Sequence, residues 1–451
     1  MKNNIRLLLW LTIVGVSECL YAQNNTFSPY SRYGIGDINN TAFTFQKGMA
    51  NVGIALPLDT TAPVFINNIN PASLGMLKFA NIEAGGYYLF SDIRNKSNVS
   101  AQFQSANFNY LSVAFPIRHF SGLSFGLMPY SATGYQINQA QTLSGVGDVN
   151  YQYTGSGGLN KVYMAYGISL YKFIKDKNDS SKHIFRTLIK NMSFGVNAYY
   201  LFGNITQTSM AIYPNSAYYY NFADDRSLRI AGMSADIGMQ TSIPISKNKS
   251  KYIGFGLFFS NPSKLNVTYD YLAYNFAYDY YGQKALVDTV SYINNNAGKL
   301  KLPISYGVGI GYFILNKMGI NLDVKYTDWS KYYLITDNAN VKNAFEFNLG
   351  GYYQPDRFSS GKGNYWGKVI YRLGVSYNTG YQEYNGTAVP LMMGTTGLSL
   401  PVGLYRAFSA LHISFQYGLK GNASTLLKEN IFRINLGVTL NDRWFIKYKY
   451  D

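Results

Sequence analysis

The chain has 451 residues, and its 39 Lys and Arg against 23 Asp and Glu give a net charge of +16. Only 14% of the residues are charged, whereas an ordinary soluble domain has ~25%. Tyr (43) and Phe (28) are abundant instead. Because tyrosine has an apolar ring and a polar hydroxyl, this composition favours a membrane–water interface over an ordinary soluble domain.

The first 22 residues predict a secretory signal peptide. Lys2 and Arg6 form a positive n-region, residues 7–16 are an apolar run of ten, and Ala22 offers a cleavage site. The run is too short for a membrane-spanning helix of ~20 residues. Cys19 offers the alternative of lipidation, but the preceding Glu18 argues against it. Cleavage after Ala22 leaves an exported chain without cysteine, which packing and hydrogen bonds alone must hold together.

Export also restricts the partners that the positive charge can serve. An exported protein seldom meets nucleic acid, so no nucleic-acid partner is expected. Phosphate-bearing headgroups of membrane lipid and lipopolysaccharide are the expected anions.

Residues 23–78 show no periodic pattern. They contain the stretches SPYSRYGIGD (28–37), KGMANVGIAL (47–56) and NNINPASLG (67–75). Pro71 fixes its own φ and restricts Asn70 to extended geometry. This segment is expected to be irregular, and its purpose depends on the fold of the residues after it.

From residue 79 onward, apolar and polar residues alternate. Ile320, Leu322 and Val324, for example, alternate with Asn321 and Asp323. A period of two puts apolar side chains on one sheet face and small polar ones on the other. Fourteen strands are predicted, at 79–90, 107–117, 121–131, 158–171, 191–207, 228–245, 251–268, 301–314, 319–330, 344–354, 367–380, 393–403, 408–419 and 430–441.

The strand lengths separate a membrane barrel from a soluble β-sandwich. Sandwich strands average ~5–6 residues, whereas tilted membrane strands need ~9–11. Long links (91–106, 132–157, 208–227, 269–300, 331–343, 381–392 and 420–429) alternate with mostly short ones, and link 172–190 is long enough for a helix at the inner rim. Long outer loops and short inner turns are typical of outer-membrane barrels. The predicted fold is all-β: a 14-stranded antiparallel transmembrane barrel over 79–451.

A barrel of this size is too wide for its own side chains to fill. Residues 23–78 are therefore predicted to fold into the lumen as a plug, or hatch. Irregular backbone is tolerated at membrane depth only where protein or lumen water satisfies it. The alternative is a periplasmic tail that simply leads into the first strand.

Five charged residues fall on the face that is expected to point into the lumen: Asp323, Lys325, Glu346, Arg372 and Arg433. Buried charge is costly unless it is paired, so these residues are expected to pair with each other or with the plug. Arg32 and Asp37 are the candidate plug partners. The alternative is that the five charges line a wet lumen.

Catalytic and metal-binding patterns are absent from the sequence. His119, His183 and His412 lack ligand spacing, and there is no metalloprotease, nucleophile-elbow or P-loop motif. His412 and Ser414 lie two apart on one strand, and Asp224-Asp225 is more typical of a solvated acidic pair than of a Ca²⁺ site. No enzyme, cofactor or metal is therefore predicted.

The N-terminal segment resembles a known family. Ala50, Gly53 and Ala55, followed by Asn70-Pro71-Ala72 and then the first strand, resemble the hatch of FadL-like transporters of hydrophobic compounds. The resemblance implies a 14-stranded barrel with an N-terminal hatch motif at Asn70, Pro71 and Ala72. The C-terminal stretch NIFRINLGVTLNDRWFIKYKYD resembles another FadL-like branch, the barrel subunit of the type IX secretion system.

Two functions remain open at this point. The first is passive passage of a hydrophobic small molecule across the outer membrane of a Gram-negative cell. The second is a non-transporting barrel subunit that binds protein partners in a secretion or outer-membrane assembly complex. An apolar lumen pocket and a lateral opening would favour the first, and co-purification with a large partner the second.

Overall fold

The computed structural model describes residues 26–57, 65–173, 184–214, 218–246, 248, 250–335, 341–357, 365–384, 386–402, 409–422 and 424–442. The predicted signal peptide lies outside the described residues. The N-terminal segment contains η1 Pro29–Arg32, β1 Asp37–Ile38, α2 Thr44–Lys47 and η2 Pro71–Met76. The other helical turns are η3 Leu170–Lys172, α3 Ile184–Lys190 and α4 Tyr365–Lys368. α3 lies within the link where an inner helix was expected.

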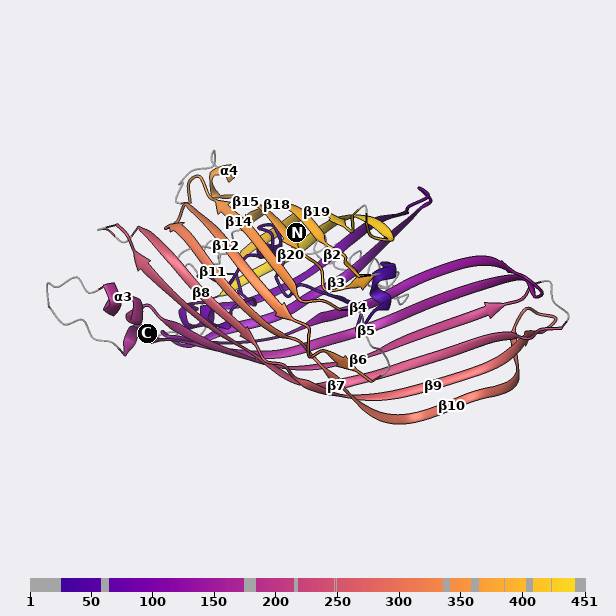
Figure 1. Cartoon of the computed structure of the whole chain (residues 1–451). Coiled ribbons are helices and arrows are strands. Elements are labelled where there is room, and N and C mark those ends of the chain that lie inside the picture. Colours follow the sequence, from indigo (N-terminus) through magenta and orange to yellow (C-terminus); the bar gives the residue numbers. More distant parts are fainter. Residues whose placement is uncertain are drawn as a thin grey trace, which may run out of the picture.

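Fourteen long strands form a closed antiparallel barrel, as predicted (Figure 1). The last strand pairs with the first over sixteen residue pairs, from Ala80↔Asp442 to Asn95↔Leu427, which closes the ring. The barrel strands are β2 Ala80–Asn95, β3 Ser100–Arg118, β4 Ser121–Leu143, β5 Gly147–Ser169, β6 Ser193–Ile212, β7 Asn221–Pro244, β8 Lys251–Ser260, β11 Ile304–Ile314, β12 Met318–Asp328, β14 Ala344–Tyr353, β15 Ile370–Asn378, β18 Leu391–Val402, β19 Ser409–Lys420 and β20 Leu427–Asp442.

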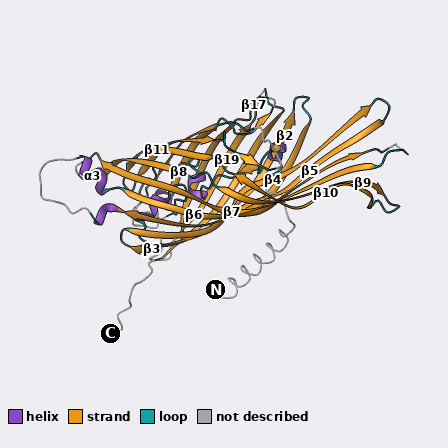
Figure 2. Ribbon diagram, turned by 60° about the horizontal axis from the view of Figure 1, so that its bottom comes forward, coloured by secondary structure: helices purple, strands orange, loops and turns teal. Residues whose placement is uncertain are grey.

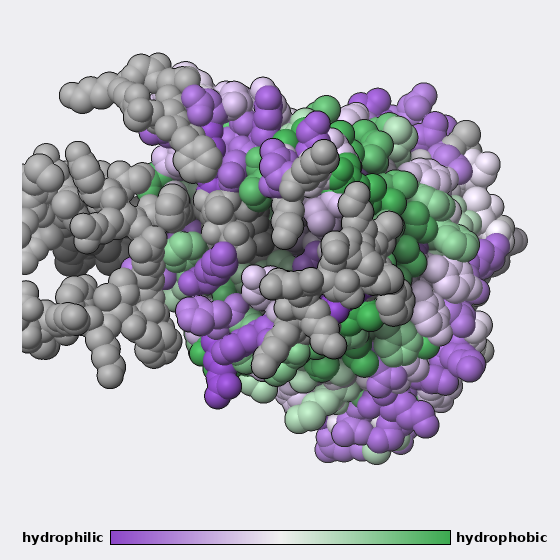
Figure 3. All heavy atoms as spheres, turned by 90° about the vertical axis from the view of Figure 1, so that its left-hand side faces the viewer, coloured by the Kyte–Doolittle hydropathy of each residue, from purple (hydrophilic) through white to green (hydrophobic). Residues whose placement is uncertain are grey.

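Apolar side chains point away from the lumen. On β6, Val196 is 50% exposed whereas the next residue, Asn197, is 1% exposed, and the same alternation runs through Phe194 and Phe202. An outward apolar band with a polar inside is the pattern of a membrane barrel. Figure 3 looks onto the end with the short turns, where green hydrophobic patches lie on the visible wall among purple hydrophilic residues. Among the described residues, no helix is long and apolar enough to cross a bilayer.

Several predicted outer loops are strands. Links 91–106, 132–157 and 208–227 mostly continue the barrel strands outward, and link 269–300 lies within the hairpin of β9 Lys264–Tyr278 and β10 Lys284–Lys301. The two-residue strands β13 Tyr333–Leu334, β16 Glu383–Tyr384 and β17 Thr387–Ala388 are smaller additions. The loop prediction was wrong because alternation weakens where both sheet faces are in water.

The outer parts of β4, β5, β6 and β7, together with β9 and β10, form a sheet that projects beyond the barrel, which we call the outer wing (Figures 1 and 2). Its two edge strands are β4 and β10.

The wall is split between β3 and β4, which we call the β3–β4 gap. These two strands pair only from Leu111↔Leu127 to Arg118↔Ser121, near the short-turn end. Farther out, β3 pairs with β2 and β4 pairs with β5. The gap begins near the exposed side chains of Phe108 and Leu127, at the outer limit of the apolar band on these strands.

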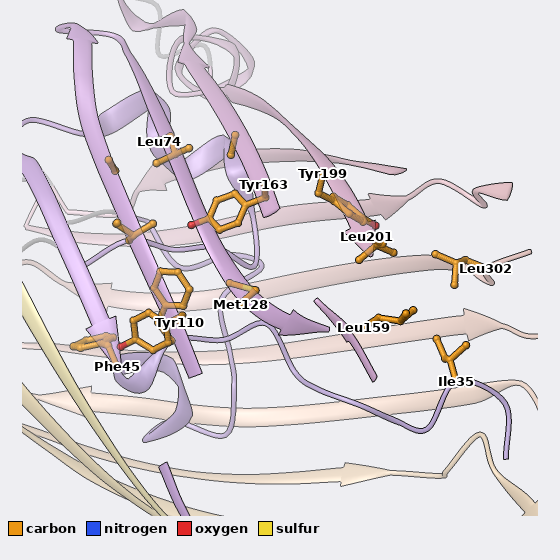
Figure 4. Close-up of a cluster of buried hydrophobic side chains, with 14 of the residues drawn as sticks. Ile35, Phe45, Leu74, Tyr110, Met128, Leu159, Tyr163, Tyr199, Leu201 and Leu302 are labelled. Carbon is orange, nitrogen blue, oxygen red and sulfur yellow. The ribbon is translucent and has the colours of Figure 1, made fainter. Parts of the chain in front are cut away.

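The described N-terminal residues pack against the inner face of the barrel. Figure 4 shows Ile35, Phe45 and Leu74 of this segment among inward side chains that include Tyr110 and Tyr163. Inward glycines let its backbone approach the wall. A Cβ built on Gly374 would lie 2.6 Å from the carbonyl carbon of Met49, which is closer than real contacts allow. The segment therefore fits against strands that lack side chains at these points.

Gly374→Leu should push residues 49–50 away from the wall. We expect a clear rise in single-channel conductance in planar bilayers, because the side chain has no room beside Met49. Gly394→Leu is the matched control, since Gly394 neighbours Val375 on the adjacent strand but faces outward with nothing within 4 Å. Heat-modifiable gel migration reports whether each barrel is intact. Equal conductance of the two folded variants would contradict the packing described here.

Candidate functional site: the lumen and its N-terminal segment

Asp323 holds the N-terminal segment through its carboxylate. This β12 residue is 1% exposed, and its Oδ2 accepts hydrogen bonds from the backbone N–H groups of Gly53 (2.7 Å) and Ile54 (2.8 Å). Gln240 of β7 also binds this part of the segment, because its Nε2 donates a hydrogen bond to Ile54 O at 2.8 Å. Residues 53–54 are thus fixed by side chains from strands on two parts of the wall.

Arg372 makes a second attachment, without any carboxylate among its hydrogen-bond partners in the described residues. Its Nη1 donates to the carbonyls of Thr44 (3.1 Å) and Phe45 (2.7 Å) in α2. Its Nη2 donates to the carbonyls of Leu398 and Ile413 on β18 and β19. The guanidinium also lies 4.9 Å from the centre of the Phe45 ring. Five fixed donors on a planar group suit this bridging of several carbonyls.

Asn70 joins three parts of the molecule. Its Oδ1 accepts from Ala72 N at 3.1 Å and so caps η2, in which Pro71 is the first residue. Its Nδ2 donates to Ile54 O (2.8 Å) and to the carbonyls of Met239 and Leu257 on β7 and β8 (both 3.2 Å). The side chain is fully buried. The structure therefore gives the Asn-Pro-Ala motif contacts to the cap, to residue 54 and to the wall.

The motif also lies against the wall at glycines. A Cβ on Gly167 of β5 would lie 2.6 Å from the Pro71 carbonyl oxygen, and Gly195 of β6 faces Pro71 in the same way. These inward glycines were visible in the sequence as the small face of the alternating strands, but their use as seats for another backbone was not.

The remaining predicted charges have neighbours of several kinds, and Lys325 and Glu346 are paired residues on β12 and β14. Arg32 lies over the Tyr153 ring (4.7 Å), Lys325 near the Phe258 ring (5.9 Å) and Arg433 over the Tyr87 ring (4.8 Å). Glu346 accepts from Asn348 Nδ2 at 3.0 Å and from Asn40 Nδ2 of the N-terminal segment at 3.4 Å. Asp37 pairs with Lys420, at 2.7 Å, and not with one of the five predicted lumen charges.

Sequence reasoning missed several inward groups. Glu83 of β2 is fully buried and accepts from Ile66 N. Lys161 and Asp236 form a buried ion pair at 3.6 Å, with Lys161 3.9 Å from the centre of the Tyr199 ring. Each of the three occupies a polar position in an alternating strand, so the same face assignment that found Asp323 would have found them.

Strand β1 takes the place of β3 beside β4. Asp37 pairs with Ala132 and Ile38 with Ser131, and Asn39 N donates to Tyr130 O at 2.9 Å. The Tyr381 hydroxyl holds β1 from the other side, since it donates to Gly36 O (2.7 Å) and accepts from Ile38 N (3.2 Å).

Burial and a nearby carboxylate keep the Tyr381 hydroxyl protonated, so that it can donate to Gly36 O. Burial raises the pKa of Tyr381 well above its ordinary value, and the negative charge of Asp37 adds to the effect. The hydroxyl therefore stays protonated even at a pH where an exposed tyrosine ionises.

A cavity of about 350 Å³ lies in the outer half of the barrel, between the N-terminal segment and the wall. Ile38 and Tyr130 line it, so β1 separates the cavity from the β3–β4 gap. Aromatic and aliphatic side chains such as Trp329, Phe258 and Leu302 share the lining with five cationic and five anionic residues: Lys47, Lys161, Lys325, Lys420 and Arg433, with Asp37, Asp236, Asp323, Glu346 and Glu429. The cavity is therefore amphipathic, with balanced charge.

The histidine that might have suggested catalysis has a structural role. Both ring nitrogens of His412 are hydrogen-bonded, Nδ1 to Ser399 (2.8 Å) and Nε2 to Thr439 (2.9 Å), and Ser414 is not their partner. Asp224 pairs with Arg226, and Asp225 accepts from Thr208. Within the described part of the chain, no group of three or more His, Cys, Asp or Glu is placed to hold a metal ion.

A closed ring of 14 strands with an apolar outside and an inward-packed N-terminal segment defines a transmembrane β-barrel with the fold of FadL-like barrels. This confirms the predicted class and agrees with the expected outer-membrane location.

Solved structures of this fold are similar along almost the whole chain. The toluene transporter TbuX of Ralstonia pickettii has a TM-score of 0.53 at 12% identity, covering 89% of this chain and 99% of that chain. A FadL homologue of Pseudomonas aeruginosa has a TM-score of 0.53 at 11% identity, covering 91% and 100%. The monoaromatic hydrocarbon channel CymD has a TM-score of 0.51 at 12% identity, covering 91% and 99%. At these identities the similarity establishes the fold.

Within this fold, the chain belongs to the BamG family, whose model matches residues 4–175 and 183–451. No curated protein matches the chain.

Asp323→Ala should release residues 53–54. Hydrogen bonds to a charged group contribute ~1.5–3 kcal/mol each, so loss of two favours opening by at least ~100-fold. A cysteine introduced at Ala55, which is 3% exposed, should then react with a maleimide far faster than in the parent. Lys325→Ala, two residues along the same strand, is the control. Similar labelling rates in the two backgrounds would show that Asp323 does not anchor the segment.

Asn70→Ala and Asn70→Asp should both raise the rate at which maleimide labels the cysteine introduced at Ala55. An aspartate keeps the cap on Ala72 but cannot donate to the carbonyls of Ile54, Met239 and Leu257. Fast labelling at position 55 in both variants is expected. If Asn70→Asp labels as slowly as the parent, the motif only caps η2 and does not join the segment to the wall.

Proposed function

We propose that this barrel lets small hydrophobic molecules pass the outer membrane without energy input. The observation that carries the proposal is the position of β1, which fills the place of β3 beside β4 at Ala132 and Ser131. It stands between the outer cavity and the gap in the wall. Movement of Asp37, Ile38 and the residues next to them would therefore connect the cavity to the surrounding lipid.

In this proposal, residues 26–57 and 65–78 act as a hatch, and most of the hatch stays in place. Asp323, Arg372 and Asn70 fix residues 44–54 to the wall. The clamp on β1 is shorter, since it consists of a two-residue ladder, the Tyr381 hydroxyl and the Asp37 carboxylate, which bonds with Lys420, Gln382 and Thr26. Proteins of similar structure are a toluene transporter and a monoaromatic hydrocarbon channel, and the mixed lining of the cavity suits a small aromatic or amphipathic molecule. No catalytic step is assigned to the chain.

A disulfide across β1 and β4 tests this path. Ile38 and Ser131 are paired residues, so Ile38→Cys with Ser131→Cys can be bridged at ordinary strand spacing. The oxidised variant should lose uptake of a hydrophobic dye in cells, and dithiothreitol should restore it. The control pair is Leu349→Cys with Val375→Cys, two partners on the outward face of β14 and β15. Unchanged dye uptake when the disulfide between positions 38 and 131 is formed would contradict the proposed path.

A second candidate function is favoured by the charge of the cavity. Ten charged side chains in the lining are unusual for a hydrophobic solute, and a non-transporting subunit of a secretion or outer-membrane assembly complex needs no apolar path. Native purification with mass spectrometry of bound lipids and proteins separates the two functions. A stoichiometric large protein partner and a barrel free of lipid-like molecules would favour the subunit over the channel.

A further inference from the structure

The outer wing has two edge strands that differ in how they are protected. Exposed edges attract other strands, and proteins usually blunt them with bulges, charges or covering segments. On β10, three register shifts interrupt the ladder with β9, at Leu286/Asp288, Thr289/Ser291 and Ile293/Asn296, and Lys284 and Asp288 add charge. This edge is therefore poorly suited to bind a further strand.

The β4 edge lacks these features. From Ser131 to Leu143 its ladder with β5 is regular. Its outer nine residues, YQINQAQTL (135–143), contain no charge and no proline, and Gln136 and residues 138–142 are exposed. On the side away from β5, the described residues provide no ladder partner beyond Ala132. Beyond Gly134, backbone groups that point to this side are free to pair.

The inner part of the same edge already binds a strand. β1 pairs with Ser131 and Ala132, and the Ser31 hydroxyl both accepts from Gly134 N (3.0 Å) and donates to Gly134 O (3.1 Å). The free stretch continues directly from this intramolecular interface.

We propose that residues 135–143 of β4 are a strand-addition site for an extended, uncharged polar segment of a different protein at the cell surface. Main-chain hydrogen bonds would give affinity, and the Gln- and Asn-rich side chains would favour uncharged neighbours. The proposal goes beyond passage through the lumen, because the wing lies outside the cavity and the hatch.

Other occupants fit this edge less well. After cleavage at Ala22, residues 23–25 span at most ~10 Å, whereas nine edge residues extend ~30 Å. In two copies of the chain inserted in one membrane, both β4 strands run outward from the membrane. Antiparallel pairing of two identical edges needs a two-fold axis perpendicular to the strands, which such copies lack. Lipopolysaccharide is anionic, and residues 135–143 contain no Lys or Arg.

The first test uses the purified full chain and a synthetic peptide VNYQYTG, the sequence of residues 149–155 that pairs with the other edge of β4. Hydrogen–deuterium exchange should show new protection of amides 135–143 and none at 284–293. The double variant Gln139→Lys/Gln141→Lys should weaken peptide binding at least tenfold. Val290→Lys/Tyr292→Lys on the β10 edge is the matched control and should bind as the parent does.

Absence of protection at millimolar peptide, or equal protection on both edges, would overturn the proposal. In cells, a photo-crosslinking amino acid in place of Gln139 should form an adduct with another protein, and Gln141→Lys should abolish this adduct. The same amino acid in place of Val290 should form no such adduct. An adduct only of twice the chain mass, or only with lipopolysaccharide, would replace the proposed partner by a second copy or a lipid. Heat-modifiable migration of every variant confirms that the barrel is folded.

Discussion

Close approach of the N-terminal backbone to inward-facing glycines is the constraint on which the rest of this barrel depends. A 14-stranded ring is too wide to be packed by its own side chains. Gly374, Gly195 and Gly167 therefore leave room for residues 49 and 71, and charged or amide side chains between the glycines satisfy the exposed backbone. Asp323 and Arg372 meet N–H and carbonyl groups of the segment, so the cost of burying their charge is offset by hydrogen bonds without opposite charges.

The sequence predicted the barrel because alternation survives wherever one face meets lipid and the other the lumen. The strand number and the inward position of Asp323 followed from that pattern. The outer wing did not, since residues 284–297 of β10 are exposed on both faces and their alternation carries no burial signal. The partners of Asp37 and Arg32 were also beyond reach, because Lys420 and Tyr153 lie on strands that only the closed ring brings near them. Asn70 was found through a motif, but its bonds to β7 and β8 depend on where the segment enters the ring.

The same architecture separates a fixed part from a part that can move. Residues 44–54 and 70–76 contact many strands, whereas β1 completes the wall with only two residue pairs at the β3–β4 gap. In the proposed function, a gate at that point would open a path without unfolding the rest of the N-terminal segment. The outer wing extends from the same β4 strand, so a partner bound to its edge would lie next to the gate.

Amide hydrogen exchange in the N-terminal segment tests the central claim most directly. If the segment is held inside the ring, amides of residues 44–56, including Gly53 and Ile54 bonded to Asp323, exchange as slowly as those of the β12 strand. Residues 37–39 then exchange faster than 44–56, since only a two-residue ladder, the Tyr381 hydroxyl on Ile38 N and the Tyr130 carbonyl on Asn39 N protect them. Complete exchange of residues 44–56 within seconds, in a barrel whose strands stay protected, would contradict this structure of the lumen.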